Sequence, residues 1–454
     1  MILNFSLLLI CLSTLFIYFY RVDRFQLTPL ATNFHLFGAT IYVVGTLLIF
    51  DQSDTMHLEW AFYCLINYIF LILGTIFASS IFRFDFKIAT ENLANFEWQH
   101  KPSSSEIPFI LFMALISALA TFYFFSLIGA VIPIEAAINL AQGADIGDSG
   151  KSAIEARKSI HYGASGEYYG AGYFSQFTNT ILPLSCLLLI FAYRISSNRL
   201  YLILFIIFMP IAVLAMTGTG RRGVIAGFIF FIIMWSRWKT LSEFRPSGLT
   251  RTSIIVFGVI LVGFLTTVIA RDIVSENPII NSLYGFLFIF DRVFISPSAQ
   301  ELETFEIFLA NSKSTNGAGW LVQLNDILPG HRPSLANEIH ALLGGNEFGN
   351  AGFGVYGEKY YNFGWMGILV SFIWGFILYA FDSKILSTKK KGFIWIVLCY
   401  SAFCLGMAAS PIDLFNGGFI TCFIYLLCFK IFNTAYKFLL ISQQQKNNRN
   451  FYPS

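Results

Sequence analysis

The segment Pro329-Gly-His-Arg-Pro-Ser334 lies within Arg271–Gly367, the longest stretch of this chain that a membrane could not bury. Most of the remaining sequence consists of apolar runs separated by short turns. The stretch instead collects charged and titratable side chains between Gly, Pro, Asn and Ser residues, namely Arg271, Asp272, Arg292, His331, Arg332, Glu338, His340 and Glu358. Charge is scarce in this chain, so the stretch predicts a large polar loop that carries functional residues.

The composition indicates a protein that lies in lipid. Only 12% of the 454 residues are charged, against about 25% in soluble domains. Apolar runs close to the length that a helix needs to cross a bilayer recur along the chain. The seven cysteines all fall within apolar runs and form no C-x-x-C pair, so they predict buried thiols rather than a disulfide framework or a zinc site.

We therefore predict an all-α polytopic membrane protein, in which residues 1–454 form a single integral membrane domain with about eleven transmembrane helices. Met1–Tyr20 has no basic start and no A-x-A cleavage site, so it is expected to be the first span rather than a signal peptide. The expected spans are 2–20, 30–50, 58–80, 108–132, 173–193, 200–217, 223–236, 253–270, 361–381, 392–409 and 417–438.

Lys and Arg set the expected orientation, because the cytoplasmic loops of membrane proteins are enriched in them. One alternation places most basic residues inside, with the N-terminus outside and the C-terminus inside. The outward segments are then two long loops, 134–172 and 271–360, and three short ones, 51–57, 218–222 and 410–416. Loops longer than about fifteen residues are commonly functional or disordered, so 134–172 is interpreted either as a flap over a site or as a tether.

The loop 271–360 contains two further expected elements. Ile279–Phe290 is apolar but too short to span the membrane, which indicates an interfacial or re-entrant segment. Ser298–Leu309 has the pattern of a short amphipathic helix. Its acidic residues are expected on a solvated face rather than in a metal site: Glu301, Glu303 and Glu306.

Two arginines follow the sixth span in Thr217-Gly-Thr-Gly-Arg-Arg-Gly223. A glycine-rich turn before a helix exposes backbone N–H groups, and a guanidinium group binds phosphate in a bidentate manner. Arg221 and Arg222 on the outer face therefore predict an anion site; the alternative is that they reach towards lipid headgroups. Arg271 and Arg292 each stand beside an aspartate, so each is interpreted as a substrate contact or as half of a structural ion pair.

The prolines of Pro329–Ser334 restrict the backbone on both sides of a His-Arg pair. Arg332 offers a further anion clamp and His331 a titratable group. Glu338 or His340 can accept a proton from a hydroxyl group, or can serve only as hydrogen-bond partners that stabilise the loop. The sequence contains no D-x-D and no H-E-x-x-H motif, so metal-independent chemistry without a cofactor is expected.

Three segments carry a resemblance to a known family. Thr217–Gly223 is similar to a turn of small residues and arginine, Asp326–Ser334 to a P-G-R-P-S element with His331 inserted, and Gly357-Glu-Lys-Tyr-Tyr-Asn-Phe-Gly364 to an aromatic-Asn-Phe-Gly entry into a span. With the number of spans and the late outer loop, the chain resembles the bacterial O-antigen polymerases (Wzy). The resemblance implies a fold like the membrane glycosyltransferases of the C class.

The resemblance also implies an activity: transfer of a growing glycan from undecaprenyl diphosphate to the non-reducing end of a new lipid-linked repeat unit. The expected place is the periplasmic face of the bacterial inner membrane. The implied partners are undecaprenyl-diphosphate-linked glycans, the lipid bilayer and a chain-length regulator, with no nucleic acid. The leaving diphosphate needs preorganised positive charge, which arginine supplies.

Residue roles follow from these expectations. We expect Arg222, Arg332, His340 and Glu338 to be catalytic. The expected substrate-binding residues are Arg221, Arg271, Arg292, His331, Glu358, Tyr168 and Tyr169, with Glu358 orienting an arginine. Aromatic rings in outward segments can stack on sugar faces, and Tyr356, Tyr360 and Trp320 are further candidates of this kind.

Two other functions stay open. An O-antigen ligase, which joins finished polymer to lipid A-core, shares the architecture and the use of arginine. A flippase or other transporter of lipid-linked oligosaccharides would show repeated halves and ionisable residues near the middle of the membrane. Here the charges stand at the ends of spans and the sequence shows no internal repeat.

Overall fold

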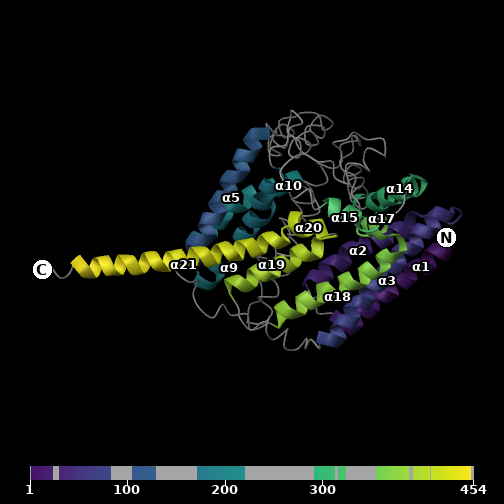
Figure 1. The fold of residues 1–454 in the computed structure, drawn as a ribbon, viewed down its shortest axis with the longest axis horizontal. Helices are drawn as coiled ribbons and strands as arrows, with labels where there is room; N and C mark the ends of the chain where they lie inside the picture. Colours follow the sequence, from purple (N-terminus) through teal and green to yellow (C-terminus); the bar gives the residue numbers. More distant parts are fainter. Residues whose placement is uncertain are drawn as a thin grey trace, which may run out of the picture.

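The computed structural model describes residues 2–23, 30–82, 105–128, 171–219, 291–311, 315–323, 354–387, 392–409 and 411–450 (Figure 1). In this part of the chain the helices are α1 (Ile2–Tyr18), α2 (Leu30–Ile49), α3 (Thr55–Phe82), α5 (Glu106–Ile128), α8 (Ala171–Gln176), α9 (Leu182–Ser196), α10 (Arg199–Thr219), α14 (Ser296–Asn311), α15 (Ala318–Gln323), α17 (Gly357–Phe363), α18 (Gly367–Leu386), α19 (Phe393–Met407), α20 (Pro411–Asn416) and α21 (Phe419–Asn450). Short helical turns join some of them: η1 (Phe19–Asp23), η2 (Phe177–Ile181), η3 (Asp291–Ile295) and η5 (Gly364–Met366).

The expected class, a polytopic helical membrane protein, is confirmed. Seven described helical segments are long and apolar enough to cross a membrane: Ile2–Asp23, Leu30–Ile49, Thr55–Phe82, Glu106–Phe124, Tyr173–Tyr193, Gly357–Leu386 and Phe419–Ser442. Two shorter apolar helices, Arg199–Ala212 and Phe393–Met407, coincide with two more expected spans. The remaining expected spans, 223–236 and 253–270, lie outside the described residues, so the count of eleven stays a prediction.

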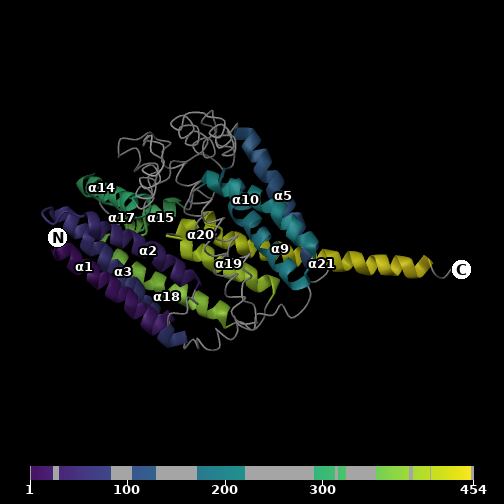
Figure 2. The same ribbon diagram turned by 180° about the vertical axis from the view of Figure 1, so that it is seen from behind.

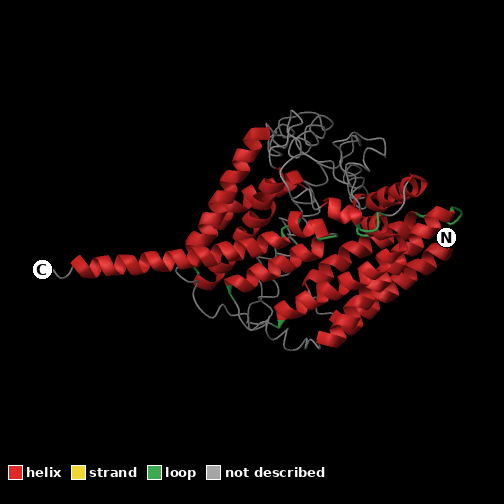
Figure 3. Cartoon of the chain, viewed as in Figure 1, coloured by secondary structure: helices red, strands yellow, loops and turns green. Residues whose placement is uncertain are grey.

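The long helices form two groups that α19 joins. One group contains α1, α2, α3 and α18, and the other contains α5, α9, α10 and α21, as opposite views show (Figures 1 and 2). α19 packs against both α2 and α21. Large apolar side chains such as Phe5, Phe122 and Phe438 point outwards from the peripheral helices, which suits contact with lipid. No strand occurs among the residues that the structure describes (Figure 3).

α3 and α18 make the most extensive helix–helix contact of the described elements. Their backbones approach closely because each helix has a glycine at the contact. A Cβ atom on Gly375 would overlap the carbonyl oxygen of Leu71, and one on Gly74 would overlap the carbonyl oxygen of Phe372. Small residues at such positions are the usual means by which membrane helices gain contact.

A buried carboxylate, that of Asp382, joins the C-terminal part of α18 to α2. Asp382 accepts hydrogen bonds of 2.8 Å from the backbone N–H groups of Ala31 and Thr32 and from the Thr32 hydroxyl. These N–H groups belong to the first turn of α2, where no intrahelical acceptor exists and where negative charge is favourable. Asp382 therefore fixes the position of α2 relative to α18 and α3.

The opposite end of the bundle is formed by the turn between α2 and α3 together with α14, α15 and α17 (Figure 1). The Ser53 backbone and hydroxyl donate hydrogen bonds to the Asp51 carboxylate in this turn, which lowers the pKa of Asp51. The helix directions place Ser53 and Ser387, at the end of α18, at opposite ends of the bundle. This agrees with the expected alternation, in which the turn and the loop 271–360 face outwards.

We expect Ser53→Cys to react with a membrane-impermeant maleimide in intact cells, and Ser387→Cys to react only after permeabilisation. Both serine side chains are exposed, so the difference in labelling depends only on which side of the membrane the maleimide can reach. The unmodified protein is the control, because six of its seven cysteines are buried and the seventh, Cys428, is half-buried in a span. Labelling of Ser387→Cys from outside would reverse the proposed orientation.

Candidate functional site

Most of the residues predicted from sequence lie outside the described part of the chain: Tyr168, Tyr169, Arg221, Arg222, Arg271, His331, Arg332, Glu338 and His340. Ile279–Phe290 also lies outside it. Arg292 belongs to η3, which leads into α14, and Glu358 belongs to α17. α10 ends at Thr219, and only Gly220 separates it in the sequence from the two arginines of the predicted anion site. The structure thus describes the elements that flank the predicted site.

The expected helix at Ser298–Leu309 is confirmed as α14, but the expected solvated face is wrong for Glu301. Glu303 is exposed, whereas Glu301 is only 2% exposed. Glu301 shares a buried helix face with Leu302 and Phe305, because residues separated by three or four positions lie on one side of a helix. That spacing is present in the sequence and is the signal that would have separated Glu301 from its acidic neighbours.

Backbone contacts hold the Glu301 carboxylate in place. Its Oε1 atom accepts a hydrogen bond of 3.2 Å from the N–H of Gly357, the first residue of α17. Gly354 packs directly on the carboxylate, since a Cβ atom there would overlap it. The glycines before the ninth expected span have no side chain, so the Glu301 carboxylate of α14 can lie directly against the backbone there.

Glu358 and Lys359 bring two more charged groups to this buried region. The carboxylates of Glu358 and Glu301 lie close enough to the Lys359 amine to interact with it electrostatically, and Lys359 is only 1% exposed. Lys359 donates a hydrogen bond of 2.9 Å to the Ser371 hydroxyl, which donates one of 2.8 Å to Asn67 on α3. Glu358 was expected to orient an arginine, which stays a prediction; among the described residues, its carboxylate interacts with Lys359.

Aromatic rings surround the buried charges. The ring centroids of Trp60 and Phe305 are 4.7 Å apart, and those of Phe305 and Tyr360 are 4.9 Å apart. These rings line a small pocket together with Glu301, Thr304, Gly357 and Tyr361, and the pocket has room for about one water molecule. The Nε1 atom of Trp60 is buried and has no hydrogen-bond partner in the described part of the chain. The pocket therefore combines apolar walls with a donor and a carboxylate.

Two of the predicted stacking rings are packed inside the protein. Tyr356 is fully buried and donates a hydrogen bond of 3.0 Å to the carbonyl oxygen of Ala39 on α2, and burial raises the pKa of its hydroxyl well above the usual value. This buried position gives Tyr356 a packing role and makes it unsuited to stacking on a sugar. Tyr360 is 9% exposed, and it lines the pocket. Trp320 is half-buried against Phe363, with ring centroids 4.8 Å apart.

Asn362 links the two ends of the segment that contains Pro329–Ser334. Its Oδ1 atom accepts a hydrogen bond of 2.9 Å from the N–H of Trp320 in α15, and its carbonyl oxygen accepts one of 2.8 Å from the N–H of Gly317. Its Nδ2 atom donates one of 2.9 Å to the carbonyl oxygen of Glu358. α15 ends at Gln323 and α17 begins at Gly357, so the predicted His-Arg segment starts and finishes beside this anchor.

No protein-family model, curated protein or solved structure matches this chain. The chemistry of the site is therefore argued from its own residues.

One described group of side chains has the composition of a metal site: Asp54, His57 and Glu306. Its hydrogen bonds indicate another role. The N–H of Asp51 donates to Nδ1 of His57 at 3.1 Å, so neutral His57 carries its proton on Nε2, which faces Glu306. Asp54 accepts the N–H of Met56 at 2.7 Å and caps α3. A ligating nitrogen must be unprotonated, so this arrangement fits a contact between α3 and α14.

The arrangement places a buried carboxylate and an indole N–H among apolar rings. Glu301 can accept hydrogen bonds or a proton, and Trp60 can donate a hydrogen bond. Sequence reasoning missed Glu301, Trp60 and Lys359, because each looks like part of a span or of a solvated helix until the partner helices are known.

Proposed function

We propose that this protein polymerises lipid-linked oligosaccharide repeat units at the periplasmic face of the bacterial inner membrane. The growing glycan is transferred from undecaprenyl diphosphate to the non-reducing end of a new repeat unit. Both substrates are held in the bilayer by lipid chains with their diphosphates at its surface, so a polytopic membrane protein with its polar residues at one end of the bundle suits this reaction.

The observation that carries the proposal is the position of Gly357–Gly364, a segment on which the resemblance to the O-antigen polymerases rests. It forms α17 and the first residue of η5 at the expected outer end of α18. Through Asn362 it anchors α15, and through Gly357 it contacts Glu301. Asn362, the Asn of this motif, thus connects α15 with α17, the two helices that border the segment containing Arg332. An active-site loop needs such an anchor if its side chains are to be held in place.

The proposed chemistry needs two kinds of group. Arg222 and Arg332 hold the donor diphosphate and stabilise the negative charge that grows on it as the glycosidic bond to the lipid breaks. Arg221, Arg271 and Arg292 are further candidates for contact with substrate. A proton acceptor takes the proton of the attacking hydroxyl group, and Glu338 and His340 are the sequence candidates for it. The mechanism assigns no step to a metal ion.

The lipopolysaccharide of a deletion strain tests this function. Loss of the polymer ladder, with a single repeat unit still attached to the core, is the expected result. Bare core with polymer accumulating on the lipid carrier would identify a ligase instead. Lipid-linked repeat units that remain on the cytoplasmic side would identify a transporter.

A second test uses purified components and removes the influence of partners. Purified protein and lipid-linked repeat units are expected to yield polymer without added divalent cations. The chain-length regulator is expected to alter the length distribution rather than to be required for bond formation. Absence of polymer under conditions in which the protein is folded and the lipid substrate intact would refute the proposal.

A further inference from the structure

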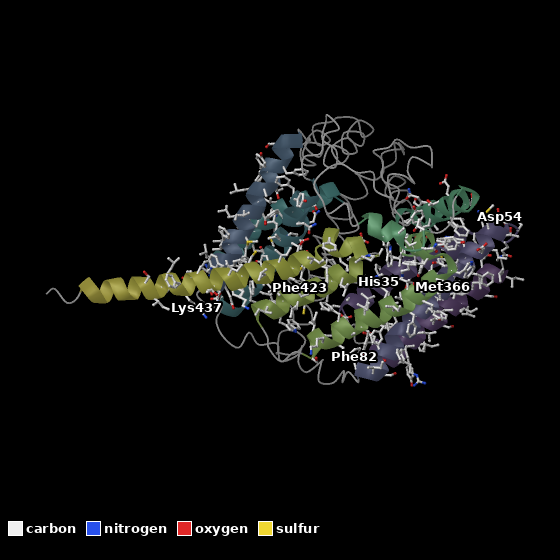
Figure 4. The ribbon with its side chains drawn as sticks, in the orientation of Figure 1. His35, Asp54, Phe82, Met366, Phe423 and Lys437 are labelled. Carbon is white, nitrogen blue, oxygen red and sulfur yellow. The ribbon has the colours of Figure 1, made fainter. Side chains whose placement is uncertain are left out.

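We propose that Lys359 is a positioning residue of the polymerisation reaction, and that it holds α17 to α3 through Ser371 and Asn67. The proposal rests on the proposed function and adds to it a residue of the described part of the chain. The three side chains come from three elements: Lys359 from α17, Ser371 from α18 and Asn67 from α3. Met366, labelled in Figure 4, marks η5, the turn that leads from α17 into α18.

A continuous network of hydrogen bonds joins the three helices. Nζ of Lys359 donates one of 2.9 Å to the hydroxyl of Ser371, and this hydroxyl donates one of 2.8 Å to Oδ1 of Asn67. Nδ2 of Asn67 donates one of 2.9 Å to the carbonyl oxygen of Tyr63, one turn earlier in α3. This last bond fixes the orientation of the Asn67 amide, so its oxygen atom faces Ser371 and sets the direction of the network.

The network is closed to solvent. Lys359 is 1% exposed, and Ser371 and Asn67 are fully buried. No other lysine or arginine is buried in the part of the chain whose side chains the structure describes. Burial of an amine removes its hydration, and this cost is offset only where hydrogen bonds or opposite charges are held around it. Ser371 supplies the bond, and Glu358 and Glu301 lie close enough to interact electrostatically. Lys359 would lose these interactions if α17 were displaced.

α17 has few means of its own to keep its orientation. It contains seven residues, and a helix of this length is unstable unless other elements hold it. Gly364, which follows it, has a positive φ of 55°, so the helix does not continue directly into α18. The rotation of α17 about its axis must therefore be fixed by side chains that reach other helices.

Lys359 and Asn362 lie on the same face of α17, because positions three apart are neighbours on a helix. Asn362 accepts a hydrogen bond of 2.9 Å from the N–H of Trp320 at its side chain, and one of 2.8 Å from the N–H of Gly317 at its carbonyl oxygen. A rotation of α17 that breaks the Lys359 bond would also move Asn362 away from α15. Lys359 thus keeps both borders of the segment that contains Arg332 in place relative to α3.

The effect of this role is on the rate of the reaction. A misplacement of about 1 Å caused by a change far from the chemistry can cost about 100-fold in rate. Lys359 is buried and does not touch the substrate in this proposal. Its loss is therefore expected to lower kcat more than it changes KM.

Two substitutions interrupt the network at different points. Lys359→Met keeps an unbranched side chain of similar length but removes the donor. Ser371→Ala removes the hydroxyl that joins Lys359 to Asn67 and leaves Lys359 in place. The matched control is Ser401→Ala, because Ser401 is also buried but its hydroxyl donates within its own helix, to the carbonyl oxygen of Leu398 in α19 at 2.7 Å.

Amide hydrogen exchange of the full-length protein in detergent is the first readout and does not require polymerisation. The amides of Gly317 and Trp320 donate to Asn362, so they report whether α17 still holds α15. Their exchange is expected to be roughly 2- to 10-fold faster in Lys359→Met and in Ser371→Ala, which corresponds to the loss of about one hydrogen bond. The control variant should exchange as wild type does. Unchanged exchange at both amides in the two folded variants would overturn the proposal.

Polymer formation from purified lipid-linked repeat units is the second readout, with melting temperatures to show that each variant is folded. Lys359→Met and Ser371→Ala are expected to lower kcat by about 10- to 100-fold with little change in KM. The double variant should be no slower than Lys359→Met alone, because both substitutions interrupt one network. The control variant should polymerise at the wild-type rate.

The outcomes separate this proposal from the proposed function. A wild-type kcat in folded Lys359→Met, or losses of rate that multiply in the double variant, would overturn the positioning role. If wild type forms no polymer while exchange changes as expected, the proposed function fails and the role of Lys359 in holding α17 stands.

Discussion

Gly375→Ala and Gly74→Ala are each expected to lower the melting temperature of the purified protein strongly. In both variants the new methyl group would occupy the place of a backbone carbonyl oxygen of the facing helix. A backbone atom cannot move aside as the end of a flexible side chain can, so α3 and α18 must separate. Overpacking of this kind typically costs about 1–3 kcal/mol, and occasionally more.

The separation should also disturb the site. α17 continues through η5 into α18, so a displaced α18 carries Glu358 and Lys359 with it. The Ser371 hydroxyl accepts a hydrogen bond from Lys359 and donates one to Asn67 on α3, and the second of these bonds crosses the same interface. We therefore expect activity to fall together with stability in both variants.

Gly38→Ala is the matched control. Gly38 also lies within a helix, α2, but a Cβ atom there meets no atom within 4 Å. Alanine favours the helix by up to about 1 kcal/mol over glycine, so this variant should melt at the wild-type temperature or slightly above it. Equal melting temperatures for Gly375→Ala, Gly74→Ala and Gly38→Ala would contradict the close approach of α3 and α18. Thermal unfolding in detergent, followed by fluorescence, provides the measurement.

The sequence predicts the spans in the described part of the chain well, because each one is a local feature. A helix such as α3 needs only a long apolar run, and the bilayer thickness fixes the required length. α14 was likewise predictable, because its buried residues repeat at helical spacing. The described helices begin and end within a few residues of the expected boundaries at 30–50 and 173–193.

Interactions between distant parts of the chain were not predictable in this way. Asp382 ends a span and reads as a residue near the cytoplasmic surface, yet it caps a helix some 350 positions earlier in the chain. Glu301 reads as part of an acidic group on a solvated helix, yet α3 and α17 cover it. The local sequence pattern shows where a polar residue lies in a helix, but its hydrogen-bond partner is known only once the helices are packed together.

The arginines proposed for the diphosphate lead to the second prediction. A diphosphate presents several oxygen atoms, and one guanidinium group can bind only some of them, so Arg222 and Arg332 are expected to act together. Loss of one preorganised donor typically costs about 2.7–4 kcal/mol at the transition state, which is roughly a 100- to 1000-fold loss of rate. Lysine keeps the charge but lacks the planar fork, so Arg222→Lys and Arg332→Lys should fail nearly as severely as the alanine variants.

The control is an arginine for which no contact with substrate is proposed. Arg199 is exposed at the start of α10, at the expected cytoplasmic end, and Arg199→Lys should retain full activity. Arg221→Lys separates the two interpretations of Arg221: lysine reaches lipid headgroups equally well, so the variant stays active if Arg221 points towards lipid and loses activity if Arg221 binds the diphosphate. Polymer formation by equal amounts of purified variants is the measurement. Wild-type rates for both Arg222→Lys and Arg332→Lys would show that these arginines do not bind the diphosphate and that the positive charge comes from elsewhere in the site.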